Sequence, residues 1–349
     1  MKRKKVLIIR LSALGDVIFN LPLAHILKSN NYEVHWLTSE KGYDIINNNP
    51  LVDYSVLAPV EKWKKQSFFK NLVEYIRIIR FLRSQKYDIA IDTQLLLKSA
   101  IWTAFCGAKR RIVSNSAREF AQFAGNENIG KLSYDSKTHA TQRYLKFAEH
   151  LGLDSKEIVA KLPESSEKAV EKINELTRNV DTTKPLIGIA PATTWSTKHW
   201  NKDNWKNLVK ELEKNYTLIF TGTKKDEALI EYISENKHLS IAGKTNLLEL
   251  AEFFRRCDLV ISLDSGSTHL AWACEKPKII SIFFSTPKGF YAPVGAEDKY
   301  IALSGNLSCQ PCHKKHCKLA LSEQGCTYLP KVKDVLDSVY KLLPLKEEV

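Results

Sequence analysis

Short apolar runs recur along the chain, and each is followed by a turn of small or polar residues and then by a segment with helical periodicity. The first run, Lys4–Arg10, leads into the turn Leu11–Asp16 and an apolar-periodic segment over Val17–Leu27. Short runs rich in β-branched residues predict strands, and helices between consecutive strands predict a parallel sheet covered on both faces. The first half therefore reads as a doubly wound α/β domain, with a helix at Phe68–Arg83 and further strands at Glu33–Leu37, Tyr54–Ala58, Tyr87–Asp92 and Arg111–Val113.

The same alternation restarts after a charged and polar stretch between Glu164 and Lys184. We expect strands at Leu186–Ala190, Tyr216–Thr221, Leu239–Ile241, Leu259–Leu263 and Lys278–Phe284, and helices at Asp203–Lys214 and Val332–Leu343. This pattern predicts two Rossmann-like domains, over residues 1–165 and 185–330, joined by a linker at 166–184 and followed by a helix at 331–349. Ligands of such sheets bind outside the carboxyl ends of the strands, so two facing domains would form a cleft there.

The overall composition supports a globular protein of two domains. A length of 349 residues exceeds the roughly 250–300 residues at which a single core usually stops growing. Hydrophobic residues make up 44% and charged residues 26%, which is typical of a soluble globular chain. No run approaches the roughly 20 apolar residues of a membrane span, and the first apolar run lacks a signal-peptide cleavage site. We therefore expect a cytoplasmic protein.

The charge is basic and unevenly distributed. The net charge is +13, of which residues 1–180 carry +10 through 29 basic and 19 acidic side chains. A segment over Glu61–Lys86 interleaves eight basic residues and two glutamates with aromatic and aliphatic residues. Such a segment suits an anionic lipid head group or membrane surface, although a packed helix with a solvated basic face explains it equally well. Nucleic acid is the other anionic partner that the charge allows, but the chain has no recognisable RRM, KH or helix-turn-helix signature.

Seven cysteines in a chain expected to be cytoplasmic indicate thiols rather than disulfides. Four of them are closely spaced as CxxC-x4-C-x8-C, a spacing that could hold a structural zinc ion. Turn cysteines without a metal explain the pattern as well, because the usual second CxxC is absent. The four residues concerned are Cys309, Cys312, Cys317 and Cys326.

A carboxylate lies where the first predicted strand turns into its helix, in the sequence RLSALGD at residues 10–16. Gly15 permits a close approach of backbone or ligand, and Asp16 opens the helix near the carboxyl edge of the sheet. Asp16 could cap the helix by accepting backbone N–H groups, or it could act as a general base in the cleft.

Two turns in the second half have the residues of a phosphate site. The turn DSGSTH, residues 264–269, places small residues, hydroxyls and backbone N–H groups at a predicted helix N-terminus, which is favourable for an anion. The loop ATTWSTKHW, residues 192–200, offers hydroxyls and the point charge of Lys198. Each has a structural alternative, a capped turn and a polar loop. Together they favour a nucleotide site.

These motifs, taken in order, resemble the lipopolysaccharide heptosyltransferases of glycosyltransferase family 9, most closely their heptosyltransferase I branch. The set runs through RLSALGDVIFNLP (10–22), DTQLLLKSA (92–100), AREF (117–120), HATQR (139–143), ATTWSTKHW (192–200), GTKKDE (222–227) and DSGSTHLAWA (264–273). The resemblance implies a GT-B fold, in which the first domain mainly binds the acceptor and the second mainly binds the nucleotide sugar. It also implies inverting transfer of L-glycero-D-manno-heptose from ADP-heptose to the Kdo of Kdo2-lipid A, without a metal cofactor, at the cytoplasmic face of the inner membrane.

The resemblance also assigns roles to individual residues. Asp16 becomes the general base, and Lys198 stabilises the leaving diphosphate. Donor binding is implied for Thr193, Thr194, Lys198, Glu227, Asp264, Ser265, Gly266 and His269, with the register between Asp226 and Glu227 left open. Acceptor binding is implied for Ser12, Gly15, Lys62, Lys64, Lys65, Lys98, Arg118, His139 and Arg143. For His139 and Arg143, a place on a surface helix is nearly as good an explanation.

The Cys309–Cys326 segment departs from the first branch of the family. It is more similar to heptosyltransferase II relatives, in which a Cys-rich segment also follows the second domain. The acceptor therefore stays open between Kdo2-lipid A and that of another family 9 enzyme.

Overall fold

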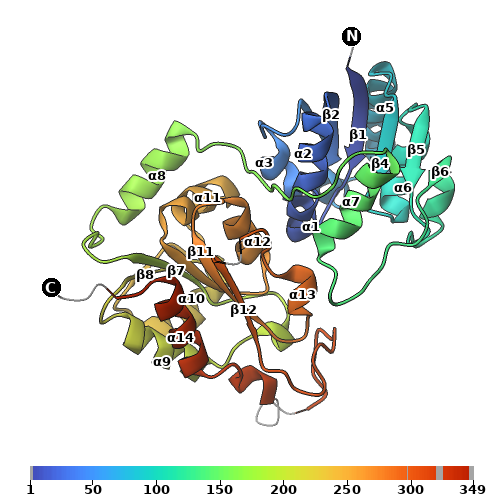
Figure 1. Ribbon diagram of the computed structural model, residues 1–349. Coiled ribbons are helices and arrows are strands. Elements are labelled where there is room, and N and C mark those ends of the chain that lie inside the picture. Colours follow the sequence, from blue (N-terminus) through green and yellow to red (C-terminus); the bar gives the residue numbers. More distant parts are fainter. Residues whose placement is uncertain (1–2, 297, 320–324, 346–349) are drawn as a thin grey trace. The chain divides into compact units, whose positions relative to one another are not determined.

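The computed structural model describes residues 3–296, 298–319 and 325–345 of the chain. The chain divides into two compact units, Met1–Glu164 and Ser165–Val349 (Figure 1). Each unit contains a six-stranded sheet in which neighbouring strands are parallel, so the α/β prediction is confirmed. Among the residues described, no helix is both long and apolar enough to cross a membrane.

The sheet of the first unit has the strand order β3-β2-β1-β4-β5-β6. Its strands are β1 (Lys4–Ile9), β2 (Tyr32–Thr38), β3 (Tyr54–Leu57), β4 (Ile89–Asp92), β5 (Arg110–Val113) and β6 (Glu127–Asn128). Residues 6–9 of β1 are fully buried, because helices cover both faces of a central parallel strand. The apolar run of β1 ends at Arg10, so polar side chains begin at the carboxyl edge of this sheet.

Helices form two layers on the sheet of the first unit (Figure 1). One layer contains α1 (Leu14–Phe19), α2 (Leu21–Ser29), α3 (Glu40–Ile46) and α7 (Ala140–His150). The other contains α4 (Val60–Trp63), α5 (Phe68–Ser84), α6 (Leu97–Phe105) and the 3-10 turn η1 (Ala121–Ala124). Strand order dictates this division, since right-handed crossovers from β1 to β3 and from β3 to β6 run in opposite directions. A stack of Trp63, Tyr75 and Trp102, with neighbouring ring centroids 4.2 and 4.8 Å apart, joins α4, α5 and α6.

The second unit has the strand order β12-β11-β10-β7-β8-β9. Its strands are β7 (Leu186–Ala190), β8 (Thr217–Phe220), β9 (Leu239–Ser240), β10 (Leu259–Leu263), β11 (Lys278–Phe283) and β12 (Tyr300–Ser304). In Figure 1, α9 (Lys202–Leu212), α10 (Glu227–Ser234) and α14 (Val332–Leu342) cover one face, and α8 (Glu167–Thr177), α11 (Leu247–Arg256) and α12 (Gly266–Ala273) lie on the other. Shorter elements are η2 (Ser196–Lys198), η3 (Lys224–Asp226), α13 (Lys288–Tyr291) and η5 (Gly325–Tyr328).

The predicted strands all exist within about two residues of their predicted bounds, whereas three other features differ. The helix expected over Val17–Leu27 is two helices, because the chain breaks at Asn20 and Pro22 opens α2. Strands β6 and β12 were not predicted; β6 has only two residues and β12 is at the sheet edge. The segment expected as a linker, residues 166–184, contains α8, whose residue Asn174 accepts a hydrogen bond from Arg256 of α11 at 2.7 Å.

Candidate active site

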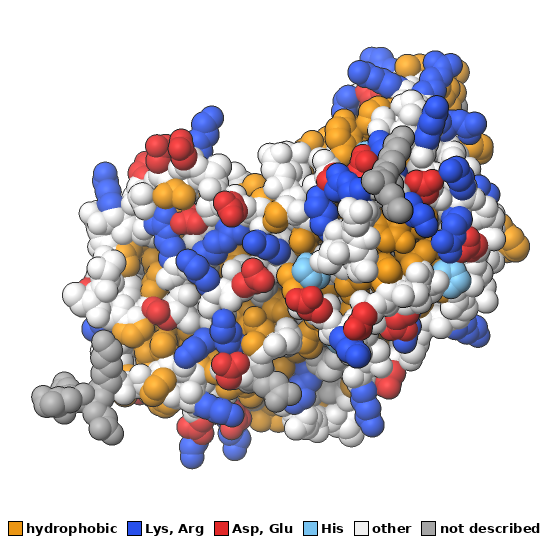
Figure 2. Space-filling model, turned by 45° about the horizontal axis from the view of Figure 1, so that its top comes forward, with side chains coloured by type: hydrophobic (Ala, Val, Ile, Leu, Met, Phe, Trp, Pro, Cys, Tyr) orange, Lys and Arg blue, Asp and Glu red, His pale blue; other side chains and the backbone are white. Residues whose placement is uncertain are grey.

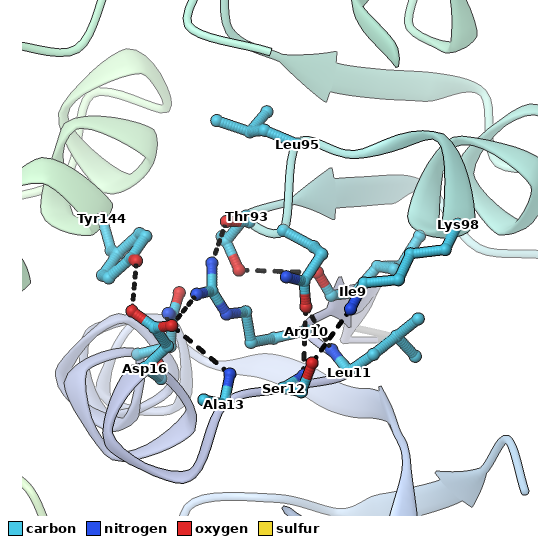
Figure 3. A network of polar contacts seen from close by, with 12 residues as sticks. Ile9, Arg10, Leu11, Ser12, Ala13, Asp16, Thr93, Leu95, Lys98 and Tyr144 are labelled. Atoms are coloured by element: carbon cyan, nitrogen blue, oxygen red, sulfur yellow. Dashed lines mark hydrogen bonds and ion pairs between the residues drawn. The ribbon is translucent and has the colours of Figure 1, made fainter. Parts of the chain in front are cut away.

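Asp16 lies in the first turn of α1, just beyond the carboxyl end of β1, within a polar network (Figure 3). Its Oδ2 atom is 2.6 Å from the guanidinium of Arg10, and its Oδ1 atom accepts a hydrogen bond of 3.2 Å from the Tyr144 hydroxyl. The Ala13 N–H also donates to Oδ2 at 3.3 Å, so the carboxylate does cap the helix. The Asp16 side chain is nevertheless 35% exposed, against 6% for Arg10. The carboxylate is thus fixed from one side and accessible from the other.

Arg10 is the buried charge that organises this network. Its guanidinium lies over the Tyr144 ring, 5.2 Å from the centroid, and donates to the Thr93 carbonyl at the end of β4. Burial lowers the pKa of Arg10 and the charge of Asp16 raises it, with a net increase, so the side chain stays charged. Burial also raises the pKa of Tyr144, and the negative charge of Asp16 adds to the rise, so its hydroxyl stays a donor.

The loop after β4 holds the turn between β1 and α1. Gln94 Oε1 accepts hydrogen bonds of 3.0 Å from the backbone N–H groups of Leu11 and Ser12, and Lys98 Nζ donates to Ser12 Oγ at 3.0 Å (Figure 3). Burial and the positive charge of Arg10 lower the pKa of Lys98. The structure therefore brings Ser12, Lys98 and Asp16 together, although they come from separate motifs.

The remaining acceptor candidates have different surroundings. Lys62 pairs with Glu74 and Lys64 with Glu61, whereas Lys65 and Arg118 are exposed. Arg143 lies over the ring of Tyr134 at 5.3 Å from the centroid. His139 is not on a surface helix: it is buried, accepts the Thr141 N–H at the start of α7, and meets Phe19 edge-on. These contacts give His139 a structural role.

In the second unit, Lys198 and Asp264 form a buried ion pair of 2.6 Å between η2 and the carboxyl end of β10. The same carboxylate accepts from the Thr286 hydroxyl and lies 3.7 Å from His269 Nε2. The Thr193 hydroxyl donates to the Asp264 carbonyl at 3.3 Å, and Thr194 is exposed beside it. The two predicted phosphate loops are therefore adjacent at one edge of the sheet.

The N-terminus of α12 points into this cluster. Ser265 precedes the helix and Gly266 is its first residue, so the first backbone N–H groups of α12 are free of intrahelical partners. The buried Thr268 hydroxyl stabilises the turn by donating to the Leu263 carbonyl. This arrangement, together with Lys198, can hold the negative charge of a phosphate group.

The Cys-rich segment packs against the same loop. The Thr197 hydroxyl donates to the Lys314 carbonyl and forms a second hydrogen bond with the Ser285 hydroxyl at 3.1 Å, and Ser196 donates to the Lys315 carbonyl at 2.9 Å. The ammonium groups of Lys198 and Lys315 lie 4.5 and 5.7 Å from the centroid of the Trp195 ring. The segment is therefore a support of the Lys198 loop.

None of the four cysteines of this segment forms a disulfide. Burial raises the pKa of the Cys326 thiol, and the nearby thiols of Cys309, Cys317 and Cys312 add to the rise. In the described ranges, no group of three or more His, Cys, Asp or Glu side chains is arranged to hold a metal ion. The zinc interpretation of the spacing thus receives no support from that part of the chain.

Glu227 lies half-buried in the first turn of α10, after β8. The carboxylate of its neighbour Asp226 is already hydrogen-bonded within its own turn, because Asp226 Oδ2 accepts from the N–H and the hydroxyl of Thr223 at 2.7 and 2.8 Å. Of the two acids whose register was left open, Glu227 is therefore the better candidate for contact with a ligand.

Comparison with known proteins identifies the family. The model for "Glycosyltransferase family 9 (heptosyltransferase)" matches residues 75–322. The chain belongs to glycosyltransferase family 9. Among its family 9 relatives, lipopolysaccharide heptosyltransferase 1 of Campylobacter coli is 30% identical over 303 residues, covering 81% of this chain and 84% of the relative.

Solved structures support the fold along nearly the whole chain. A family 9 glycosyl transferase from Veillonella parvula aligns with a TM-score of 0.81 at 19% identity, covering 97% of both chains. E. coli heptosyltransferase WaaC with ADP aligns with a TM-score of 0.74 at 20% identity, covering 97% of this chain and 99% of that one. The expected GT-B fold is confirmed, and the chain is a glycosyltransferase.

Sequence reasoning missed Arg10, Tyr144, Gln94 and Thr286. Arg10 does carry a signal, because an arginine that directly follows a buried strand needs an anionic partner. Tyr144 carries none: it is 128 residues away from Asp16 along the chain and reaches it only through the packing of α7 against α1.

Proposed function

We propose that this glycosyltransferase moves L-glycero-D-manno-heptose from ADP-heptose to the Kdo of Kdo2-lipid A, with inversion, in synthesis of the lipopolysaccharide inner core. The similarity to lipopolysaccharide heptosyltransferase 1 over 81% of the chain supports this acceptor. The site would work at the cytoplasmic face of the inner membrane, where its lipid acceptor is embedded.

Asp16 serves as the general base. Each carboxylate oxygen can accept about two hydrogen bonds. Oδ1 accepts one from Tyr144, so it keeps a free lone pair on the exposed side for the proton of the acceptor hydroxyl. Removal of this proton lets the hydroxyl oxygen attack the anomeric carbon while the bond to the diphosphate breaks.

The second unit binds the donor. Lys198, Thr193 and Thr194 hold the diphosphate with the α12 N-terminus at Ser265 and Gly266, and Glu227 accepts from the ribose hydroxyls. Asp264, supported by Thr286 and close to His269, positions Lys198 and faces the sugar. The ammonium group of Lys198 offsets the negative charge that develops on the leaving ADP, so these residues supply the electrostatic stabilisation without a metal.

Basic residues of the first unit bind the acceptor. Lys98 and Ser12 lie beside Asp16 and suit the Kdo carboxylate, with Gly15 in the adjacent turn. Lys62, Lys64, Lys65, Arg118 and Arg143 suit the second Kdo and the lipid A phosphates.

The decisive experiment incubates the protein with ADP-heptose and Kdo2-lipid A and determines the mass of the product. We expect ADP release and an added heptose, and Asp16→Asn should abolish both while circular dichroism stays unchanged. A Kdo2-lipid A that already carries one heptose is the parallel acceptor, because relatives named heptosyltransferase 2 and 3 also match this chain. Turnover only with that acceptor would overturn the assignment of Kdo, and full activity of Asp16→Asn would overturn the assignment of the base.

A further inference from the structure

Helix α5 exposes an apolar stripe to solvent. The stripe occupies one side of the first half of the helix, since its members have the spacing i, i+3, i+4, i+7. The opposite side of α5 packs on the core through Tyr75, Ile78, Ile79 and Leu82. The exposed stripe consists of Phe69 (78% exposed), Leu72 (44%), Val73 (67%) and Ile76 (40%). A contiguous exposed apolar face of this kind marks an interaction surface.

Unpaired positive charge surrounds the stripe. The two glutamates between residues 61 and 86, Glu61 and Glu74, both form ion pairs with lysines. Within the part of the chain that the structure describes, the remaining basic side chains of α5 form no ion pair. They are Lys70, Arg77, Arg80 and Arg83, all exposed. The surface therefore combines apolar groups with an excess of cations.

Two further exposed aromatic residues lie on the same face of the sheet as α5. Phe120, which directly precedes η1, and Phe123 within η1 are 79% and 78% exposed and stack on each other with centroids 6.4 Å apart. Turn η1 packs on α6, which in turn packs beside α5. In the view of Figure 2, hydrophobic and basic side chains lie side by side on the surface of the molecule.

This face adjoins the acceptor residues. The helices of a doubly wound sheet run antiparallel to its strands, so the first turns of α5 and α6 lie toward the carboxyl edge. Lys98, in the first turn of α6, makes its hydrogen bond to Ser12 at that edge. Phe69 and the exposed Leu97 occupy the same ends of their helices.

We propose that the first unit docks on an anionic lipid bilayer through the α5 stripe and the pair Phe120 and Phe123. The apolar side chains enter the interface, and Lys70, Arg77, Arg80 and Arg83 bind lipid phosphates. A second copy of the chain fits the surface less well, because it would bring two sets of unpaired cations together. The docking surface rests on the proposed function in one respect only: a membrane-embedded acceptor would meet Asp16 from the bilayer side.

The first test measures cosedimentation of the full chain with vesicles. We expect binding to phosphatidylcholine vesicles with about 30% phosphatidylglycerol, little binding to pure phosphatidylcholine, and weakening by salt. The double variant Phe69→Ser, Val73→Ser should bind about tenfold more weakly, which corresponds to about 1.4 kcal/mol. Leu345→Ser is the matched control, since Leu345 is a similarly exposed apolar residue of the second unit. Equal binding by the double variant and the wild type would overturn the proposal, as would a stripe-dependent dimer without vesicle binding.

A second measurement separates docking from catalysis. The double variant should lose activity on acceptor embedded in vesicles but keep wild-type activity on deacylated, water-soluble acceptor. Equal loss on both acceptors would assign the stripe to the catalytic site and contradict the proposal. If the wild type were inactive on both acceptors, the proposed function would fail while the vesicle-binding result would still stand.

Discussion

At the scale of single residues, the position of Asp16 depends on two groups that do no chemistry themselves. Arg10 supplies the opposite charge from beneath, and Tyr144 fixes the other carboxylate oxygen. Side-chain rotation of Asp16 would break one of these contacts. The carboxylate is therefore held in one orientation before any acceptor binds, as its proposed role as general base requires.

Tyr144→Phe tests this positioning. The variant removes the hydroxyl that donates to Asp16 but keeps the aromatic ring beneath Arg10. A hydrogen bond to a charged group contributes about 1.5–3 kcal/mol. We expect kcat to fall about tenfold with the KM for donor unchanged. Tyr216→Phe loses a comparable hydrogen bond, to Leu343 in the second unit, and should leave kcat unaltered. Wild-type kcat in Tyr144→Phe would show that Asp16 needs no such support.

Asp92 gives a prediction about stability and pH. Burial raises the pKa of this fully buried carboxyl to about 6, despite hydrogen bonds from Leu95, Ser99, Gln94 and Thr103. The folded state therefore holds the proton more tightly than the unfolded chain, whose Asp pKa is about 3.9. The contribution of Asp92 to the free energy of unfolding is fully present below pH 4. It is lost as the pH rises through 6, and the loss amounts to up to about 3 kcal/mol.

Asp92→Asn should remove this contribution. The amide oxygen of the variant can still accept from the N–H groups of Gln94 and Leu95. Its NH2 group can donate to the hydroxyls of Ser99 and Thr103. These hydroxyls can in turn donate to the carbonyls of Leu96 and Ser99. Denaturant unfolding at pH 4 and pH 7 measures the effect. The stability of the variant relative to wild type should increase over that interval, and a constant difference would contradict the raised pKa.

Much of the candidate site at this scale could be predicted from sequence, but its contacts could not. Asp16, Lys198 and Asp264 lie in turns whose residue types suggest a ligand site, although their individual roles came only from the family resemblance. The partners Tyr144 and Thr286 follow only from tertiary packing. His139 has contacts that its motif did not predict, because it is buried and accepts the Thr141 N–H at the start of α7.

At the scale of elements, the strands were predictable because fully buried parallel strands are continuous apolar runs. The elements that were not predicted from the sequence are those with weak patterns of hydrophobic and polar residues. β6 is too short for any periodicity, and the break between α1 and α2 depends on Asn20, whose side chain donates to the Asp16 carbonyl at 2.8 Å. Pro22, by contrast, was a visible signal for a new helix start.

The loop that carries Lys198 is held in place by contacts with the Cys-rich segment. Thr197 is buried and joins η2 to the Cys-rich segment through the Lys314 carbonyl and to the β11 end through Ser285. We expect Thr197→Val to lower stability by about 1–3 kcal/mol, because it leaves buried polar groups unpaired. The freed loop should also raise the KM for ADP-heptose severalfold, measured by initial rates. Ser196→Ala removes an exposed contact of the same loop and should change both quantities much less. Identical behaviour of the two variants would mean that Thr197 does not hold the loop.

At the scale of the whole molecule, the net positive charge is distributed unevenly between the two units of the fold. The first unit has 26 basic and 16 acidic side chains, and the second has 26 and 23. The excess of positive charge is therefore in the unit that carries Asp16, Lys98 and the α5 stripe. The unit with the two predicted phosphate loops is nearly balanced in charge.

This division predicts that ADP stabilises one unit selectively. A ligand at one hundred times its Kd adds about 2.7 kcal/mol to the stability of the unit that binds it. Hydrogen exchange of the full chain, with and without ADP, should show slower exchange in β7 and β10 and unchanged exchange in β1 and β4. Lys198→Ala should remove the effect, since the ammonium group of Lys198 is proposed to bind the diphosphate and lies beside Asp264 of the second predicted phosphate loop. Equal protection of β1 and β4 would contradict selective stabilisation, because each unit has its own sheet and its own buried core.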